Sequence, residues 1–102
     1  MKINNKSFNE WLEKENITYD DNMEEYRTLN GYFSMGVANT SSTTDNELIG
    51  LMVQYLLEKR YAIDKLKDNY YVDKNYINIG VNISKNLDLY TCLREAIESI
   101  KE

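Results

Sequence analysis

The sequence predicts an α+β fold in which helices cover an antiparallel sheet, and three observations lead to this prediction. Between Tyr76 and Ile83, apolar residues alternate with small polar ones, which is the period-two pattern of a half-buried strand. Residues 45–59 and 87–101 each carry an apolar stripe at helical spacing, so both can cover the apolar face of that strand. With 102 residues, of which 42% are hydrophobic, the chain suits a single domain with one modest core.

Residues 7–16 are expected to form a short helix. Ser7 is followed three positions later by Glu10, which is the spacing of a capping box. One apolar stripe at helical spacing is formed by Phe8, Trp11 and Leu12. Trp11 has two interpretations: a contact with the core, which is the usual fate of a large aromatic residue, or an anchor for a partner protein, because tryptophan is frequent at interaction hot spots.

An acidic cluster follows, formed by Asp20, Asp21, Glu24 and Glu25. If residues 20–28 form a helix, these acids fall in its first turns, where the helix dipole favours negative charge. A run of charges usually marks a solvated face, and the alternative is a docking patch for a basic partner. A divalent-ion site is a third interpretation, although the spacing is not that of an EF-hand loop.

Residues 29–43 form the least regular part of the chain. Gly31 and Gly36 interrupt any helix here, residues 32–35 could form a short edge strand, and residues 39–44 have the composition of a loop. No glycine pattern of a phosphate-binding loop is present. Residues 1–42 are therefore expected to be an N-terminal extension of a core that spans residues 43–102.

The second half of the chain is expected to run helix, sheet, helix. Thr44 and Glu47 form a capping box before the helix at 45–59, and Asn86 is the expected N-cap of the helix at 87–101. Three antiparallel strands are expected at residues 61–66, 70–73 and 74–83, with a turn at 67–69. Cys92 lies in the apolar stripe of the last helix, so it is expected to be a small buried hydrophobe rather than a nucleophile.

Tyrosines and asparagines of the predicted sheet are candidate ligand-binding residues: Tyr70, Tyr71, Asn78 and Asn82. Aromatic rings stack on bases and amides read base edges, although the phosphates of a nucleotide would need Lys, Arg or a helix N-terminus. The simpler interpretation of the tyrosines is the ordinary preference of this residue for strands. A homodimer or higher homo-oligomer could also cover the polar sheet face.

Composition argues against most enzyme classes. Histidine is absent and Cys92 is the single cysteine, which removes the commonest general base, the nucleophile pairs that use histidine, and thiolate zinc clusters. We therefore expect a non-enzymatic protein without a cofactor, a metal ion or catalytic residues. The sequence contains no signal peptide and no apolar run near 18 residues, which predicts a cytoplasmic location without membrane contact.

The net charge of −5 and the isoelectric point of about 4.7 bear on partners. A protein that binds the nucleic-acid backbone needs a patch of Lys and Arg, so direct nucleic-acid binding is not expected. An acidic chain can instead bind a basic protein, including one that itself binds nucleic acid.

The half of the chain from Thr43 to Ile100 resembles the small phage and prophage proteins with an ABA sandwich domain. Thr44 and Asp45 open the first helix of this half, and the segment from Asn86 to Cys92 opens the last. Asp88 stands where the family often has proline, and the match at Ala96 is shifted by one position. The resemblance implies a protein of a mobile element and implies no catalytic residues.

Two classes of binding function remain. The first is a phage-encoded inhibitor of a bacterial defence system, which either blocks a nucleic-acid-binding defence protein such as a CRISPR effector through acidic surface or sequesters a small nucleotide signal. The acidic cluster favours the former and the tyrosines favour the latter. The second is a toxin-immunity protein or another small protein-interaction domain, which would be equally acidic and non-catalytic.

Overall fold

The structure is a computed structural model that describes residues 1–76 and 79–101. Its elements, in chain order, are α1 (Lys6–Lys14), β1 (Ile17–Asp20), β2 (Glu25–Tyr32), β3 (Ala38–Ser42), α2 (Asp45–Glu58), β4 (Tyr61–Leu66), β5 (Asn69–Tyr76), β6 (Ile79–Asn86) and α3 (Leu89–Ser99). The strands of these residues form two antiparallel three-stranded sheets, with the orders β1-β2-β3 and β4-β5-β6. The predicted α+β class is confirmed, with a second sheet that the sequence did not predict.

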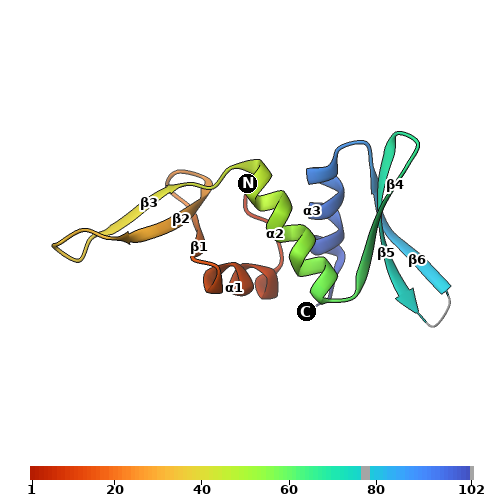
Figure 1. Cartoon of the computed structure of the whole chain (residues 1–102), viewed down its shortest axis with the longest axis horizontal. Coiled ribbons are helices and arrows are strands. Elements are labelled where there is room, and N and C mark those ends of the chain that lie inside the picture. Colours follow the sequence, from red (N-terminus) through yellow and green to blue (C-terminus); the bar gives the residue numbers. More distant parts are fainter. Residues whose placement is uncertain (77–78, 102) are drawn as a thin grey trace.

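The molecule is elongated, with extents of 54 × 26 × 18 Å. Figure 1 shows the two sheets toward opposite ends of the long axis, with α2 and α3 between them. The hairpin formed by β2 and β3, which we call the arm, projects away from the helices (Figure 1). Among the described residues, no helix is both long enough and apolar enough to cross a membrane.

One hydrophobic core runs through the middle of the molecule and takes residues from both halves of the chain. The first half contributes Ile3, Phe8, Leu12, Ile17 and Tyr26, all buried. The second half contributes residues of α2, β5 and α3: Leu48, Met52, Tyr55, Leu56, Val72, Cys92, Leu93, Ala96 and Ile97. Residues 1–42 therefore pack into the same core as residues 43–102.

The helices form where their apolar stripes predict them, but two of the three begin at a different cap. The predicted capping residue of α2 is confirmed, because the Glu47 N–H donates to Thr44 Oγ1 at 3.1 Å. α1 begins after Asn5, whose Oδ1 accepts from the Phe8 N–H at 2.9 Å, so the predicted cap at Ser7 is wrong. Asn5 is preferred because its Nδ2 also donates to Ile97 O at 2.8 Å, which ties α1 to α3.

The predicted N-cap of the last helix is also wrong. Asp88 caps α3, and its Oδ2 accepts from the Thr91 N–H at 2.9 Å and from the Thr91 hydroxyl at 2.7 Å. These two hydrogen bonds lower the pKa of the Asp88 carboxyl. Asn86 is instead the last residue of β6, where its Oδ1 accepts from the Asp88 N–H at 2.9 Å and shapes the turn into the helix.

The segment around the acidic cluster is extended, so the helix considered for residues 20–28 is not formed. β1 and β2 pair from Ile17 opposite Thr28 to Asp20 opposite Glu25. Tyr26 alternates with its polar neighbours and is buried, which is a strand pattern. Glu24 has a φ of 54° in the connecting turn, a backbone conformation that no helix continues through.

One further segment of the first sheet differs from its prediction. Residues 39–44 were expected as a loop, but residues 38–42 form β3, which pairs with β2 and completes the arm. Within this segment, Thr43 is buried and its Oγ1 lies 2.7 Å from Thr28 Oγ1. The polar Thr and Ser residues suit an exposed edge strand, although their composition is also that of a loop.

In the second sheet, β4 lies where the sequence predicts it, but the strand expected to begin at residue 74 is displaced. β5 continues to Tyr76, which pairs with Ile79, so the chain reverses inside the stretch from 76 to 83. Val81 is 43% exposed, whereas Ile83 packs against the core, so the alternating residues do not form one buried face. Ile77 and Asn78 lie outside the described residues.

Candidate functional site

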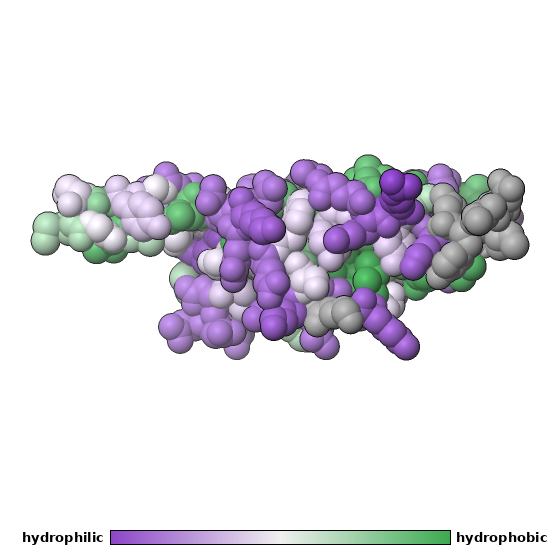
Figure 2. Space-filling model, turned by 90° about the horizontal axis from the view of Figure 1, so that it is seen from below, coloured by the Kyte–Doolittle hydropathy of each residue, from purple (hydrophilic) through white to green (hydrophobic). Residues whose placement is uncertain are grey.

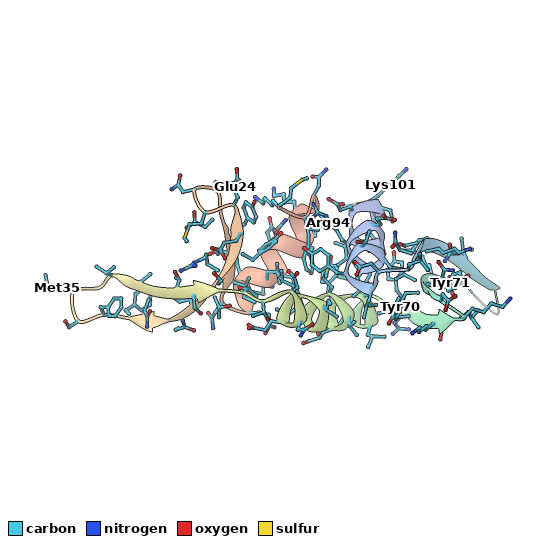
Figure 3. All side chains as sticks on the ribbon, turned by 90° about the horizontal axis from the view of Figure 1, so that it is seen from above. Glu24, Met35, Tyr70, Tyr71, Arg94 and Lys101 are labelled. Atoms are coloured by element: carbon cyan, nitrogen blue, oxygen red, sulfur yellow. The ribbon has the colours of Figure 1, made fainter. Side chains whose placement is uncertain are left out.

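The outer end of the arm carries four large exposed apolar side chains, and we call residues 31–38 the arm tip. Their exposed fractions are 68% for Tyr32, 57% for Phe33, 87% for Met35 and 58% for Val37. Met35 lies at the far end of the molecule in Figure 3, and the same end is green and pale in Figure 2. Clusters of exposed apolar residues on a protein surface commonly mark interaction sites.

Local hydrogen bonds hold the arm tip in shape. The Phe33 N–H donates to Val37 O at 2.8 Å, and the Gly36 N–H donates to Phe33 O at 2.9 Å. Gly36 has a φ of 76° and Gly31 a φ of 132°, which glycine adopts without steric cost. The pairing register shifts between Leu29 and Gly31, so a bulge lies at the base of the arm tip.

Outside the tip, the exposed side chains of the arm are polar, so the apolar tip is an isolated feature. Arg27 of β2 reaches across the sheet and donates to Thr40 O at 3.1 Å and to Ser42 Oγ at 3.1 Å. Asn30 Nδ2 donates to Ser41 Oγ at 3.0 Å. These side-chain bonds brace the two strands without an apolar core, and the tip is thus presented on a braced stalk.

The acidic cluster lies in the turn between β1 and β2, and two of its four residues have local structural roles. Asp20 Oδ1 accepts from the Asn22 and Met23 N–H groups at 2.9 and 3.0 Å, which closes the turn. Glu25 Oε1 lies 3.4 Å from Arg27 Nη1. Asp21 and Glu24 are exposed, and Figure 3 shows Glu24 on a turn that projects beside the arm. We call residues 20–25 the acidic turn.

Trp11, the other candidate partner residue, joins α1 to α2. Its Nε1–H donates to Glu58 Oε2 at 3.1 Å, and its ring meets Tyr55 edge-on with centroids 5.4 Å apart. The Phe8 ring stacks with the Trp11 ring, with their centroids 6.2 Å apart. The ring is half-buried and packs against the core, so Trp11 takes part in helix packing.

The structure separates the three candidate ligand residues that it describes. Tyr70 lies on the face of the second sheet that packs against the helices, because it shares that face with the buried Val72. Tyr71 and Asn82 lie on the opposite, open face, where Asn82 Nδ2 donates to Asp73 Oδ1 at 2.9 Å and Lys85 Nζ lies 5.6 Å from the centre of the Tyr71 ring. Asn78 lies outside the described residues.

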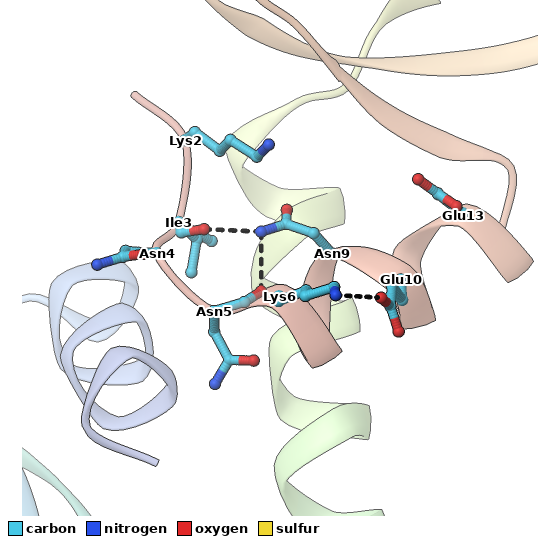
Figure 4. Close-up of a pocket in the computed structure, with 8 residues that line it drawn as sticks. All are labelled: Lys2, Ile3, Asn4, Asn5, Lys6, Asn9, Glu10 and Glu13. Atoms are coloured by element: carbon cyan, nitrogen blue, oxygen red, sulfur yellow. Dashed lines mark hydrogen bonds and ion pairs between the residues drawn. The ribbon is translucent and has the colours of Figure 1, made fainter. Parts of the chain in front are cut away.

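A hollow of about 480 Å³ lies beside the N-terminal segment and is lined by residues 2–6, Asn9, Glu10 and Glu13 (Figure 4). Asn9 Nδ2 donates to Ile3 O at 2.7 Å and to Asn5 O at 2.9 Å. Lys6 Nζ lies 3.9 Å from Glu10 Oε1 (Figure 4). These polar groups hold the N-terminal segment against α1, so the residues that line the hollow already have structural roles.

Two buried phenols have shifted acidity. Burial raises the pKa of Tyr26 to about 12, while the hydrogen bond from the Ile3 N–H opposes the rise. Burial also raises the pKa of Tyr90, and the nearby Arg94 opposes it. Both phenols stay protonated at neutral pH, where they act as packing and hydrogen-bonding groups. Among the described residues, no three His, Cys, Asp or Glu side chains gather as a metal site.

The arm tip was not among the residues predicted from the sequence. Its signal is the run Tyr32-Phe33-Ser34-Met35-Gly36-Val37, which is apolar between two polar Thr/Ser/Asn segments. A run of this kind predicts a buried strand as readily as an exposed turn, and only the hairpin geometry distinguishes the two.

Comparison with models of protein families, with curated proteins and with solved structures finds no match to this chain.

Proposed function

We propose that this chain is a non-enzymatic inhibitor that binds one partner protein stoichiometrically and places the arm tip in an apolar groove of that partner. The observation that carries the proposal is the exposure of Tyr32, Phe33, Met35 and Val37 on a projecting hairpin. Burial of apolar surface against a partner contributes roughly 25 cal/mol per Å². Aromatic residues and methionine are also enriched at the centres of protein interfaces.

The acidic turn supports a basic partner. Asp21 and Glu24 are exposed in this turn, and the chain carries a net charge of −5. Complementary charge accelerates association and selects the partner. A defence protein that binds nucleic acid has a basic surface. The acidic chain would occupy that surface as a mimic of nucleic acid. The resemblance to small phage proteins makes a CRISPR effector the partner to test first.

The test is the survival of a phage in bacteria that carry a CRISPR defence against it. Expression of the wild-type chain is expected to restore plaque formation. Because the proposed inhibition is stoichiometric, size-exclusion chromatography of the purified chain mixed with the effector is expected to give a 1:1 complex. Absence of both effects across the main classes of CRISPR effector would overturn this choice of target.

Matched variants test the surface. Phe33→Ser combined with Met35→Ser is expected to abolish plaque restoration, whereas Leu66→Ser combined with Leu87→Ser, at exposed positions away from the arm (65% and 66%), is expected to preserve it. Equal loss in both pairs rejects the arm tip as the binding surface.

Charge reversal tests the acidic turn. Asp21→Lys with Glu24→Lys is expected to abolish inhibition, and Asp64→Lys with Glu95→Lys is the exposed control with the same change in net charge. Full inhibition by the first pair rejects the mimic form of the proposal.

A further inference from the structure

Three lysines border one cavity at the end of α2, although the chain as a whole is acidic. The cavity has a volume of about 330 Å³ and is bordered by Lys59, Lys74, Lys101, Tyr55, Tyr61 and Ser7. We call it the lysine cavity. Lys59 at the end of α2 and Lys101 near the C-terminus both border it, and Figure 1 shows these two parts of the chain near each other and away from the arm. Its volume is in the range of small-molecule sites.

The residues of the lysine cavity come from five separate parts of the chain, one of which is α1 with Ser7. Lys59 follows the last turn of α2, Tyr61 begins β4, Lys74 lies on β5, and Lys101 follows α3. A slightly smaller hollow of about 290 Å³ shares Tyr61, Lys74 and Lys101 with it. The fold therefore brings together cations that are far apart in the sequence.

Aromatic rings hold two of the lysines in place. Lys59 Nζ lies 5.5 Å from the centre of the Tyr55 ring, and Lys74 Nζ lies 5.8 Å from the centre of the Tyr61 ring. Tyr55 is buried and both rings pack with the core, so their positions are set by the fold. A cation–π contact is favourable and limits the conformations that each lysine can adopt.

The electrostatics of the lysine cavity favour a multivalent anion. Among the described residues that line either hollow there is no Asp or Glu. An anion with several charges can interact with more than one of these ammonium groups at once. Lysine is a common ligand of phosphate, to which it donates charge-assisted hydrogen bonds.

We propose that the lysine cavity binds a small molecule that carries two or more phosphate groups, of the size of a nucleoside triphosphate. In this proposal Lys59, Lys74 and Lys101 contact the phosphates, and Ser7 lines the same cavity. This site differs from the one predicted from the tyrosines and asparagines of the sheet. It shares no residue with the arm tip, so the two proposals stand or fall independently.

The test is isothermal titration calorimetry of the whole chain with tripolyphosphate, ATP and AMP at low ionic strength without magnesium. Tripolyphosphate and ATP are expected to bind at a 1:1 ratio with a Kd below about 1 mM, and AMP at least about fivefold more weakly, because it has one phosphate. If ATP binds more tightly than tripolyphosphate, the site also recognises the nucleoside. Absence of saturable binding at about 10 mM, or AMP that binds as tightly as ATP, overturns the proposal.

Variants locate the site. Lys59→Gln and Lys101→Gln change exposed residues that the core does not need, and each is expected to weaken ATP binding about fivefold. The matched control is Lys65→Gln, because Lys65 Nζ also lies over a tyrosine, 5.2 Å from the centre of the Tyr70 ring, but borders neither hollow. The control is expected to bind within about twofold of the wild type. An equal loss in the control and the cavity variants shows attraction by net charge alone and rejects the site.

Discussion

At the scale of single residues, the Tyr26 phenol connects three parts of the N-terminal half. Its Oη accepts from the Ile3 N–H at 2.9 Å and donates to Asn9 Oδ1 at 2.7 Å. Asn9 in turn donates to Ile3 O, so the hydrogen bonds close a loop. The Tyr19 ring meets the Tyr26 ring edge-on at 5.0 Å. One side chain of β2 thereby fixes both the chain before α1 and the first turns of α1.

We predict that Tyr26→Phe lowers the free energy of unfolding by about 1–3 kcal/mol, because the buried Ile3 N–H then has no acceptor and Asn9 Oδ1 loses its donor. Urea denaturation at pH 7 measures the change. Tyr32→Phe removes the same hydroxyl from an exposed ring of the arm tip and is expected to change stability by less than about 0.5 kcal/mol. Similar losses in the two variants would contradict the role assigned to the buried phenol.

The difference in stability between the wild type and Tyr26→Phe is also predicted to depend on pH. The pKa of Tyr26 is raised from 10.0 to about 12 in the folded chain, so folding favours the protonated phenol. This contribution is fully present below pH 10.0 and is lost as the pH rises toward 12. The stability of the wild type should therefore fall more steeply between pH 10 and 12 than that of Tyr26→Phe. Parallel curves would show that Tyr26 is not the titrating group.

At the scale of elements, the helices were predictable because their signals are local. The apolar stripe of α2 and its capping residue Thr44 need no knowledge of the rest of the chain. The cap of α1 was missed because Asn5 is selected by its bond to Ile97 O, on a helix that is 92 residues away in sequence. The strands of the first sheet were missed because strand pairing is a non-local property, and acidic residues near Tyr26 suggested a helix.

The candidate sites follow the same division. The acidic turn was recognised as a charged cluster, because its acids are close together in the sequence, but its shape comes from the pairing of β1 with β2. The arm tip was not recognised, because exposure of an apolar run depends on which strands pair. The lysine cavity was beyond prediction, because Lys59, Lys74 and Lys101 meet only in the folded chain.

The arm gives a prediction at this scale. Gly31→Ala is expected to weaken the pairing of β2 with β3 by about 1–3 kcal/mol, because its φ of 132° strains any residue with a Cβ atom. No neighbouring atom lies within 4 Å of that added Cβ, so strain and not crowding is the cause. Hydrogen exchange of the arm amides should accelerate more than exchange in α2, because the strain weakens the pairing of β2 with β3.

Gly50→Ala is the matched control. Gly50 lies inside α2 and also has no neighbouring atom within 4 Å of an added Cβ. Alanine is the better helix former, so this change is expected to raise stability by about 0.5–1 kcal/mol. A stabilised arm in Gly31→Ala, or a loss of stability in Gly50→Ala, would argue against the backbone explanation.

At the scale of the whole molecule, the two halves of the chain depend on each other. Phe8 meets Tyr55 edge-on with centroids 5.0 Å apart, so α1 covers the side of α2 that faces away from the second sheet. Asn5 Nδ2 donates to Ile97 O, and the Asn4 N–H donates to Glu98 Oε2 at 2.8 Å, so the N-terminal segment also holds α3. The elongated outline therefore encloses one continuous core rather than two separate ones.

We predict from this continuity that a fragment of residues 43–102 does not fold cooperatively, although it contains two helices and a complete sheet. Loss of residues 1–42 removes Ile3, Phe8 and Leu12 from the shared core and exposes core residues of the second half that pack there. Each such deletion costs about 2–5 kcal/mol, and the stability of a whole domain is only about 5–15 kcal/mol. Circular dichroism during heating measures the transition.

Replacement of the arm tip by a two-residue Asn-Gly turn is the control, and it should leave the melting transition sharp, because the arm tip contributes no residue to the core. A sharp transition in the 43–102 fragment would show instead that the first 42 residues are an appendage on an independent domain.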